Sequence, residues 1–230
     1  LQVGCFAMNF ACSQITGLSR MAGPNRATRF FSVLAVALML ATPTVAQSRS
    51  GARDFVQNLS DTVIKDLASR KISDGERVIR LRQLLTRSFD IPAVAKFVLG
   101  VYWRRTNDKQ FNEFLKLYEI YVAHNYAGLF KKYSGQTVDV LRVVPVNDDL
   151  TVVYGRINQV SGPAISMEMR IRKKTSEYKA LDLKIEGISM PLTHRKQFAS
   201  VINQRRKGVQ GLIEALRKAT NRFEAETPSQ

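Results

Sequence analysis

Apolar residues recur at three- and four-residue steps in the first half of the chain, which predicts several amphipathic helices. The first of these patterns covers residues 53–67. A second helix is expected to begin after Ser73, because Ser73 and Glu76 have the spacing of a capping box. A third, shorter helix is predicted over residues 90–99, where a proline lies in the first turn and Gly100 follows the last apolar position.

The longest helical pattern starts within residues 106–110 and ends at Gly135. Its apolar face is rich in aromatic side chains and consists of Phe111, Phe114, Leu115, Tyr118, Tyr121, Val122, Leu129 and Phe130. In most proteins such a face packs on a core. Rows of aromatic residues also suit an adaptable ligand cavity, so the pattern leaves both interpretations open.

After Gly135 the period of the pattern changes to two, which predicts β-strands. Four strands are expected, at residues 137–144, 150–160, 164–173 and 178–186. One face of the third strand consists of Ile165, Met167, Met169 and Ile171. In the fourth strand the inward positions are Leu181, Leu183 and Ile185, and the outward positions are Asp182, Lys184 and Glu186. Turn residues join the first three strands as a meander, so we expect an antiparallel sheet that is covered on one face.

Two further helical patterns close the chain, from about residue 191 to 204 and after Gly208. Helices on both sides of one block of strands indicate the α+β class. We expect N-terminal helices, a four-stranded antiparallel sheet, and C-terminal helices packed on one sheet face. Residues 47–230 are numerous enough to form a single domain with its own core.

A different pattern occupies residues 26–46, where two arginines precede an almost wholly apolar run over residues 30–41 and small residues follow. This order is typical of a secretory signal peptide, with cleavage expected after Ala46 and Met21 as its start. The apolar run is shorter than the roughly 20 residues that span a bilayer. We therefore expect residues 1–46 to be an N-terminal extension with a signal peptide, and the domain to be exported to the periplasm.

Cysteine and charge narrow the possible functions. Cys5 and Cys12 both precede the predicted signal, so the expected domain has no disulfide and no thiol nucleophile. Three of the 35 Lys and Arg residues precede residue 47, which leaves 32 basic against 19 acidic residues and a net charge of +13. Such a balance favours anionic lipid headgroups or an acidic protein partner, and export makes nucleic acid a poor candidate.

Residues that could perform catalysis or bind metal are few. His124 and His194 have no partner at the spacing of a metal site. Asp148 and Asp149 are adjacent in a turn, where aspartate is favoured for backbone reasons. We therefore expect no enzyme activity, no metal and no cofactor.

Basic residues are concentrated in clusters that are either solvated surfaces or docking surfaces for a membrane or an acidic partner. The candidate docking residues are Arg170, Arg172, Lys173, Lys174, Arg205, Arg206 and Lys207. Arg170 and Arg172 are expected to project from the strand face opposite the apolar one. The apolar face would then be free for a hydrophobic ligand.

Three segments carry a family resemblance: FDIPAVA at residues 89–95, VLGVYW at 98–103 and DLKIEGISM at 182–190. With Arg195, Phe198 and the closing helix, they resemble the MlaC family, also called the toluene-tolerance auxiliary component of ABC transporters. The resemblance spans about residues 53–218. Two aromatic residues depart from the family pattern, Tyr178 in place of Trp and His194 in place of Tyr.

The resemblance implies a periplasmic shuttle that carries phospholipid between an outer-membrane lipoprotein complex and an inner-membrane ABC transporter. It also implies transient contact with membrane surfaces, and a hopanoid-like lipid as a second candidate ligand. The ligand of the family lies between sheet and helices. The residues expected to line that site are Phe97, Tyr102, Phe111, Phe114, Tyr118, Val153, Ile165, Met167, Met169, Ile171, Leu181, Leu183 and Ile185.

Two alternatives remain open at this stage. The first is a non-catalytic basic module that docks on a membrane complex. The second is a pocket enzyme that uses Asp182 with a neighbouring tyrosine as an acid–base pair, although strand alternation places Asp182 on the outward face.

Overall fold

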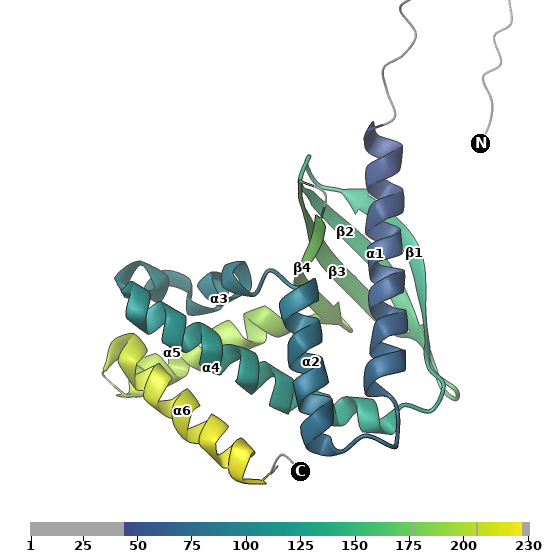
Figure 1. Cartoon of the computed structure of the whole chain (residues 1–230). Coiled ribbons are helices and arrows are strands. Elements are labelled where there is room, and N and C mark those ends of the chain that lie inside the picture. The colour runs from purple at the N-terminus through teal and green to yellow at the C-terminus, as the bar shows by residue number, and fades with distance from the viewer. Residues whose placement is uncertain (1–43, 176, 206, 227–230) are drawn as a thin grey trace, which may run out of the picture. The chain divides into compact units, whose positions relative to one another are not determined.

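The computed structural model describes residues 44–175, 177–205 and 207–226. Within these ranges the chain is an α+β domain in which helices precede and follow one antiparallel sheet, as predicted (Figure 1). The basic stretch and the apolar run of the predicted signal peptide lie outside the described residues. In the part of the chain that is described, every helix is too short or too polar to cross a bilayer.

Three helices come first: α1 (Thr44–Leu67), α2 (Asp74–Ser88) and α3 (Ile91–Leu99). The predicted cap of α2 is present, because Ser73 Oγ accepts the amide hydrogen of Glu76 at 3.1 Å. The Glu76 carboxylate lies 2.6 Å from the Arg80 guanidinium. Gly100 ends α3 with φ of 58°, a left-handed conformation that glycine adopts readily.

The long pattern predicted up to Gly135 is divided between helices of two kinds. A 3₁₀ turn, η1 (Gly100–Arg105), leads into α4 (Asp108–Ala127), and a second 3₁₀ turn, η2 (Gly128–Lys132), follows it. Asn107 and Gln110 form a complete capping box at the start of α4.

The sheet has five strands in the order β1-β2-β3-β4-β5, with all neighbours antiparallel. The strands are β1 (Thr137–Pro145), β2 (Leu150–Asn158), β3 (Ile165–Lys174), β4 (Glu177–Ile185) and β5 (Ile188–Ser189). The sequence pattern missed β5, because a strand of two residues is too short to show alternation. Two helices finish the domain, α5 (Met190–Arg205) and α6 (Gly208–Glu226). α5 contacts β4 and β5, whereas α6 packs on α4 and α5.

The apolar face of the sheet is covered by α1, which lies across the strands in Figure 1. Ala52 and Val56 of α1 are buried against Val153, Met169 and Ile171 of the sheet. The expectation that this face is free for a ligand is therefore wrong. The sequence pattern shows that the strands have an apolar face, but not which helix covers it.

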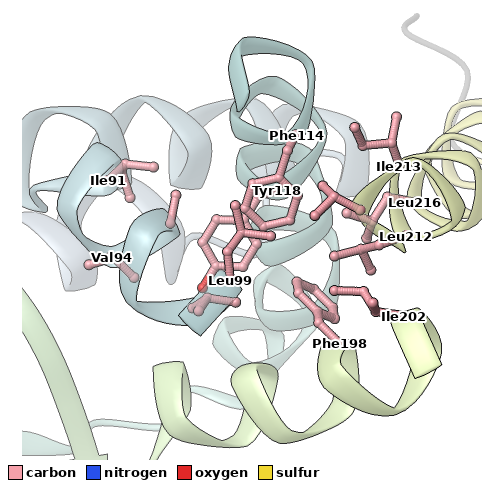
Figure 2. Close-up of a cluster of buried hydrophobic side chains, with 13 residues drawn as sticks. Ile91, Val94, Leu99, Phe114, Tyr118, Phe198, Ile202, Leu212, Ile213 and Leu216 are labelled. Carbon is pink, nitrogen blue, oxygen red and sulfur yellow. The ribbon is translucent and has the colours of Figure 1, made fainter. Parts of the chain in front are cut away.

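The aromatic face of α4 packs in a second, wholly helical core. Phe114 and Tyr118 lie among side chains of α3, α5 and α6, including Phe198 and Leu212 (Figure 2). A third and smaller cluster joins α1, α2 and the end of α4 around Leu67. The sheet and α4 thus contribute their apolar side chains to different cores.

Candidate ligand-binding site

A cavity of about 260 Å³ lies between the sheet, α3 and the start of α5. Its lining residues are Ala93, Val94 and Phe97 of α3, Pro191 of α5, Leu150 of β2, Arg170 and Arg172 of β3, and Leu181 and Asp182 of β4. The helices contribute only apolar side chains, whereas the strands contribute apolar and charged ones. The cavity is on the sheet face that carries the arginines, opposite the face that α1 covers.

A β-bulge in β4 turns one apolar residue, Leu181, toward this cavity. Arg170 pairs with Asp182 and Ile171 pairs with Ala180, so Leu181 is the extra residue between them. Ala180 lies in the cluster under α1, while Leu181 and Asp182 line the cavity. The prediction that Leu181 shares a face with Leu183 is wrong, because the bulge interrupts the alternation of the strand.

Asp90 anchors α3 beside the cavity. Its Oδ1 accepts the amide hydrogen of Ala93 at 3.3 Å, and its Oδ2 lies 2.7 Å from Lys174 Nζ and 3.6 Å from the Arg172 guanidinium. Burial alone would raise the pKa of Asp90. The contacts with Lys174, the Ala93 amide and Arg172 outweigh burial and lower this pKa below its ordinary value.

The two arginines of the cavity differ in their partners. Arg172 is shared between Asp90 and Asp149, the latter at 3.7 Å. Arg170 is exposed, and among the described residues it has no carboxylate within salt-bridge distance. Arg170 pairs with Asp182 across the strands and acts to lower the pKa of that carboxyl, and its exposed guanidinium at the edge of the cavity can also contact an anionic group of a ligand.

Asp182 is the one acidic group that lines the cavity. Its Oδ1 accepts a hydrogen bond from Ser189 Oγ at 3.0 Å, and Ser189 Oγ accepts the amide hydrogen of Leu192 at 3.2 Å. Burial raises the pKa of Asp182 more than the Ser189 hydrogen bond and the nearby cations lower it. The carboxylate is therefore part of the cap of α5 as well as of the cavity wall.

Beyond the cavity, His194 connects α5 to α4 through two tyrosines. The Tyr118 hydroxyl lies 3.0 Å from Nδ1 of His194, and the Tyr126 hydroxyl lies 3.1 Å from Nε2. Burial lowers the pKa of His194 to about 4. In the resulting neutral ring one nitrogen donates and the other accepts, so one tyrosine acts as acceptor and the other as donor.

The structure places the predicted lining residues in four locations. Phe97 and Leu181 line the cavity. Tyr102, Phe111, Phe114 and Tyr118 belong to the helical core. The strand residues in the cluster beneath α1 are Val153, Met167, Met169, Ile171, Leu183 and Ile185. Ile165, at the start of β3, pairs with Ile157 and is half-buried.

The cavity also uses residues that the sequence pattern did not single out as ligand contacts. These are Ala93, Val94, Leu150 and Pro191. The available signal was the pair of prolines, Pro92 and Pro191, which start α3 and α5 near one another. The sequence does not show that the starts of α3 and α5 meet the same strands, because this depends on the tertiary fold.

The predicted docking residues are only partly free to bind a partner. Lys174 and Arg172 contact Asp90, and Lys207 contacts Glu214 at 3.1 Å. Arg205 is exposed, Lys173 is half-buried, and Arg206 lies outside the described residues.

The described ranges contain no group of three metal-binding side chains. A second hollow, of about 640 Å³, is an open groove over α2 and Glu119 of α4. Four of its six lining residues are Arg82, Gln83, Arg87 and Glu119, which are charged or carry an amide. This composition makes it a poorer site for an apolar ligand than the cavity beside α3.

The comparisons with known proteins agree with this architecture. The fold is similar to that of the phospholipid-binding protein from Ralstonia solanacearum, which was solved in complex with a phospholipid. The TM-score is 0.67 at 22% identity, over 74% of this chain and 97% of that chain. Residues 57–218 match the family described as MlaC protein, which is well over half of the chain. The chain therefore belongs to the MlaC family.

Proposed function

We propose that this protein is a periplasmic lipid-binding carrier, not an enzyme, whose ligand enters the cavity beside α3. The family match over residues 57–218 carries this proposal. Support comes from the similarly folded Ralstonia solanacearum protein, which binds a phospholipid. The cavity combines apolar walls with the exposed Arg170 at its edge, a combination that suits acyl chains and a phosphate group.

The volume of the cavity limits how much of a lipid fits without movement. About 260 Å³ is slightly below the roughly 300–1,000 Å³ of small-molecule pockets. We therefore propose that binding a two-chain lipid moves α3 away from the sheet. Val153, Met167, Met169 and Ile171 would contact the ligand only if α1 also moves off the sheet.

A carrier has a clear physical role between two membranes. Each CH₂ group exposed to water costs about 0.8 kcal/mol, so a free lipid with two chains rarely leaves its membrane. A protein cavity exchanges one apolar environment for another, and the partners then set the direction of transport. We propose that these partners are an outer-membrane lipoprotein complex and an inner-membrane ABC transporter. In this proposal the signal peptide directs export and is cleaved near Ala46.

The test is denaturing extraction of the purified protein followed by mass spectrometry. We expect co-purified phospholipid or a hopanoid-like lipid. Leu181→Arg, which places a charge inside the cavity, should abolish the bound lipid. Leu141→Arg, at an exposed strand position, should leave it in place. A wild-type protein without lipid, or equal lipid content in the two variants, would contradict the proposal.

One observation favours an enzyme as second candidate: Asp182 lines the cavity. The expected acid–base partner was a neighbouring tyrosine. Tyr118, which Asp182 influences electrostatically, is poorly suited to that role, because its hydroxyl is hydrogen-bonded to His194 and burial raises its pKa. Asp182→Asn separates the two functions. If the protein is a carrier, the variant should keep its lipid. If Asp182 is catalytic, the wild-type extract should contain chemically altered lipid that is missing from the extract of the variant.

A further inference from the structure

Apolar side chains are exposed to solvent beside the cavity. Val101 of η1 is 71% exposed, and Phe97 of α3 and Leu192 of α5 are 44% and 43% exposed. Phe97 itself lines the cavity, and Leu192 follows the lining residue Pro191. Exposed apolar residues that gather at one place on a surface indicate a binding surface.

Within the described residues, basic side chains without a carboxylate partner lie in η1 and beside it. Arg104 and Arg105 end η1, and both are exposed. Lys96 Nζ lies 4.5 Å from the centre of the Trp103 ring, and the Arg195 guanidinium lies 5.1 Å from the centre of the Phe97 ring. Within the described residues, none of these four cations lies within 4 Å of a carboxylate.

This arrangement differs from that of the basic clusters singled out from the sequence. There, Arg172 and Lys174 contact Asp90, and Lys207 contacts Glu214. A cation held by a carboxylate has less to gain from an external anion, because its charge is already compensated. Among the described residues the four cations around η1 have no such carboxylate, and two of them, Lys96 and Arg195, lie over aromatic rings.

We propose that this surface, the rim made of Lys96, Phe97, Val101, Arg104, Arg105 and Arg195, which meets the cavity at Phe97, docks on an anionic lipid bilayer. Aromatic and aliphatic side chains among Lys and Arg are the composition of segments that lie in a membrane interface. Because Phe97 belongs to both the rim and the cavity, docking brings the cavity toward the lipid headgroups. The choice of a bilayer as partner rests on the proposed lipid-carrier function.

A second copy of the chain is a poor occupant of the rim. A twofold contact places the same patch of both subunits face to face. The unpaired arginines and lysine of one copy would then oppose those of the other. An anionic bilayer surface instead complements their charge and accepts the apolar side chains between headgroups.

The test is co-sedimentation of the purified protein with vesicles. We expect binding to vesicles that contain phosphatidylglycerol, weakened by salt, and little binding to vesicles of phosphatidylcholine alone. Arg104→Glu/Arg105→Glu should lower the affinity for anionic vesicles by about tenfold or more, since each basic residue near such a surface contributes measurably. Val101→Ser should lower it by roughly fivefold through loss of apolar contact.

The control variant is Lys218→Glu/Arg222→Glu on α6, which changes the net charge equally at exposed positions away from the rim. It should bind anionic vesicles nearly as the wild type does. Equal loss in both double variants, unchanged binding of the rim variants, or a dimer that dissociates in the Val101→Ser variant would overturn the proposal. Melting curves confirm that each variant is folded.

Lipid extraction on the same preparations separates this inference from the carrier function. The rim variants should retain wild-type amounts of co-purified lipid while losing vesicle binding. Absence of lipid from all preparations would contradict the carrier function. If the rim variants instead bind vesicles as tightly as the wild type does, only the docking surface is contradicted.

Discussion

Asp90 Oδ2 lies 2.7 Å from Lys174 Nζ, and this ion pair joins the first turn of α3 to the end of β3. The Asp90 amide also donates a hydrogen bond to the carbonyl oxygen of Ala180 in β4 at 2.9 Å. Its Oδ1 caps α3 at Ala93. One residue thus fixes α3 against two strands, and α3 forms the helical wall of the cavity.

Replacing Asp90 should separate the contribution of its charge from that of its cap. Asp90→Asn keeps an acceptor at the N-cap but removes the ion pair, and we expect a loss of about 1–2 kcal/mol, since Lys174 is largely solvated. Asp90→Ala removes the cap as well and should cost about 1 kcal/mol more. Urea unfolding measures both values. Equal stability of the two variants would show that the cap contributes nothing.

The ion pair of Asp90 should also make stability depend on pH. The pKa of Asp90 is lowered in the folded protein, so its contribution is complete above the ordinary value of 3.8. It is lost as pH falls through the lower folded-state pKa. The difference in unfolding free energy between wild type and Asp90→Asn should therefore be constant near neutral pH and shrink below about pH 4. A difference that grows on acidification would contradict this sign.

Local patterns allowed most of the fold to be predicted. Ser73 and Asp90 cap helices where the sequence places them, and the alternation of Met167, Met169 and Ile171 gives the buried face of β3. These features depend on neighbours along the chain. β5 was not predicted, because a strand of two residues is too short to show an alternating pattern.

The cavity could be predicted only in part, because it depends on contacts between distant segments. Arg170 and Arg172 were expected on the face opposite the apolar ladder, and they lie there. That α1 rather than a ligand covers the apolar face depends on how α1 docks. The position of Leu181 depends on a bulge in β4. The bulge cannot be seen in the sequence, where apolar and polar residues alternate regularly along this strand.

Acidification below pH 6.5 should destabilise the protein through His194. Burial lowers the pKa of His194 from 6.5 to about 4, so between these values the unfolded chain binds a proton that the folded protein does not. Stability should therefore fall as pH decreases from about 6.5 to 4, by about 3 kcal/mol in total. Urea unfolding at several pH values measures this slope.

His194→Gln provides the reference for that slope. Glutamine can still hydrogen-bond to a tyrosine hydroxyl but does not titrate. The pKa of Asp182 is raised by burial, and its opposing effect is common to both proteins and cancels in the comparison. If wild type and His194→Gln lose stability in parallel, His194 is not the responsible group.

Removing the two hydroxyls that contact His194 should have unequal effects. Tyr118 is buried, so Tyr118→Phe leaves a ring nitrogen of His194 without its partner in the core and should cost about 1–3 kcal/mol. Tyr126 is only partly buried, and solvent can replace its hydroxyl, so Tyr126→Phe should cost less than about 1 kcal/mol. Thermal or urea unfolding of the two variants tests this order, and the reverse order would contradict it.

Alanine substitution at Gly155 should destabilise the sheet although alanine is normally the better strand residue. A Cβ at this position of β2 would lie 2.7 Å from the carbonyl oxygen of Asp139 and 2.9 Å from Met167 Cε. The methionine end can shift, but the backbone oxygen of the paired strand cannot, so we expect a loss of about 1–3 kcal/mol. Gly128→Ala is the matched control, because its Cβ meets open space among the described residues and its φ of −62° suits alanine. That variant should be neutral or stabilised by up to about 1 kcal/mol. Equal unfolding midpoints for the two variants would show that the backbone of β1 yields to the added methyl group.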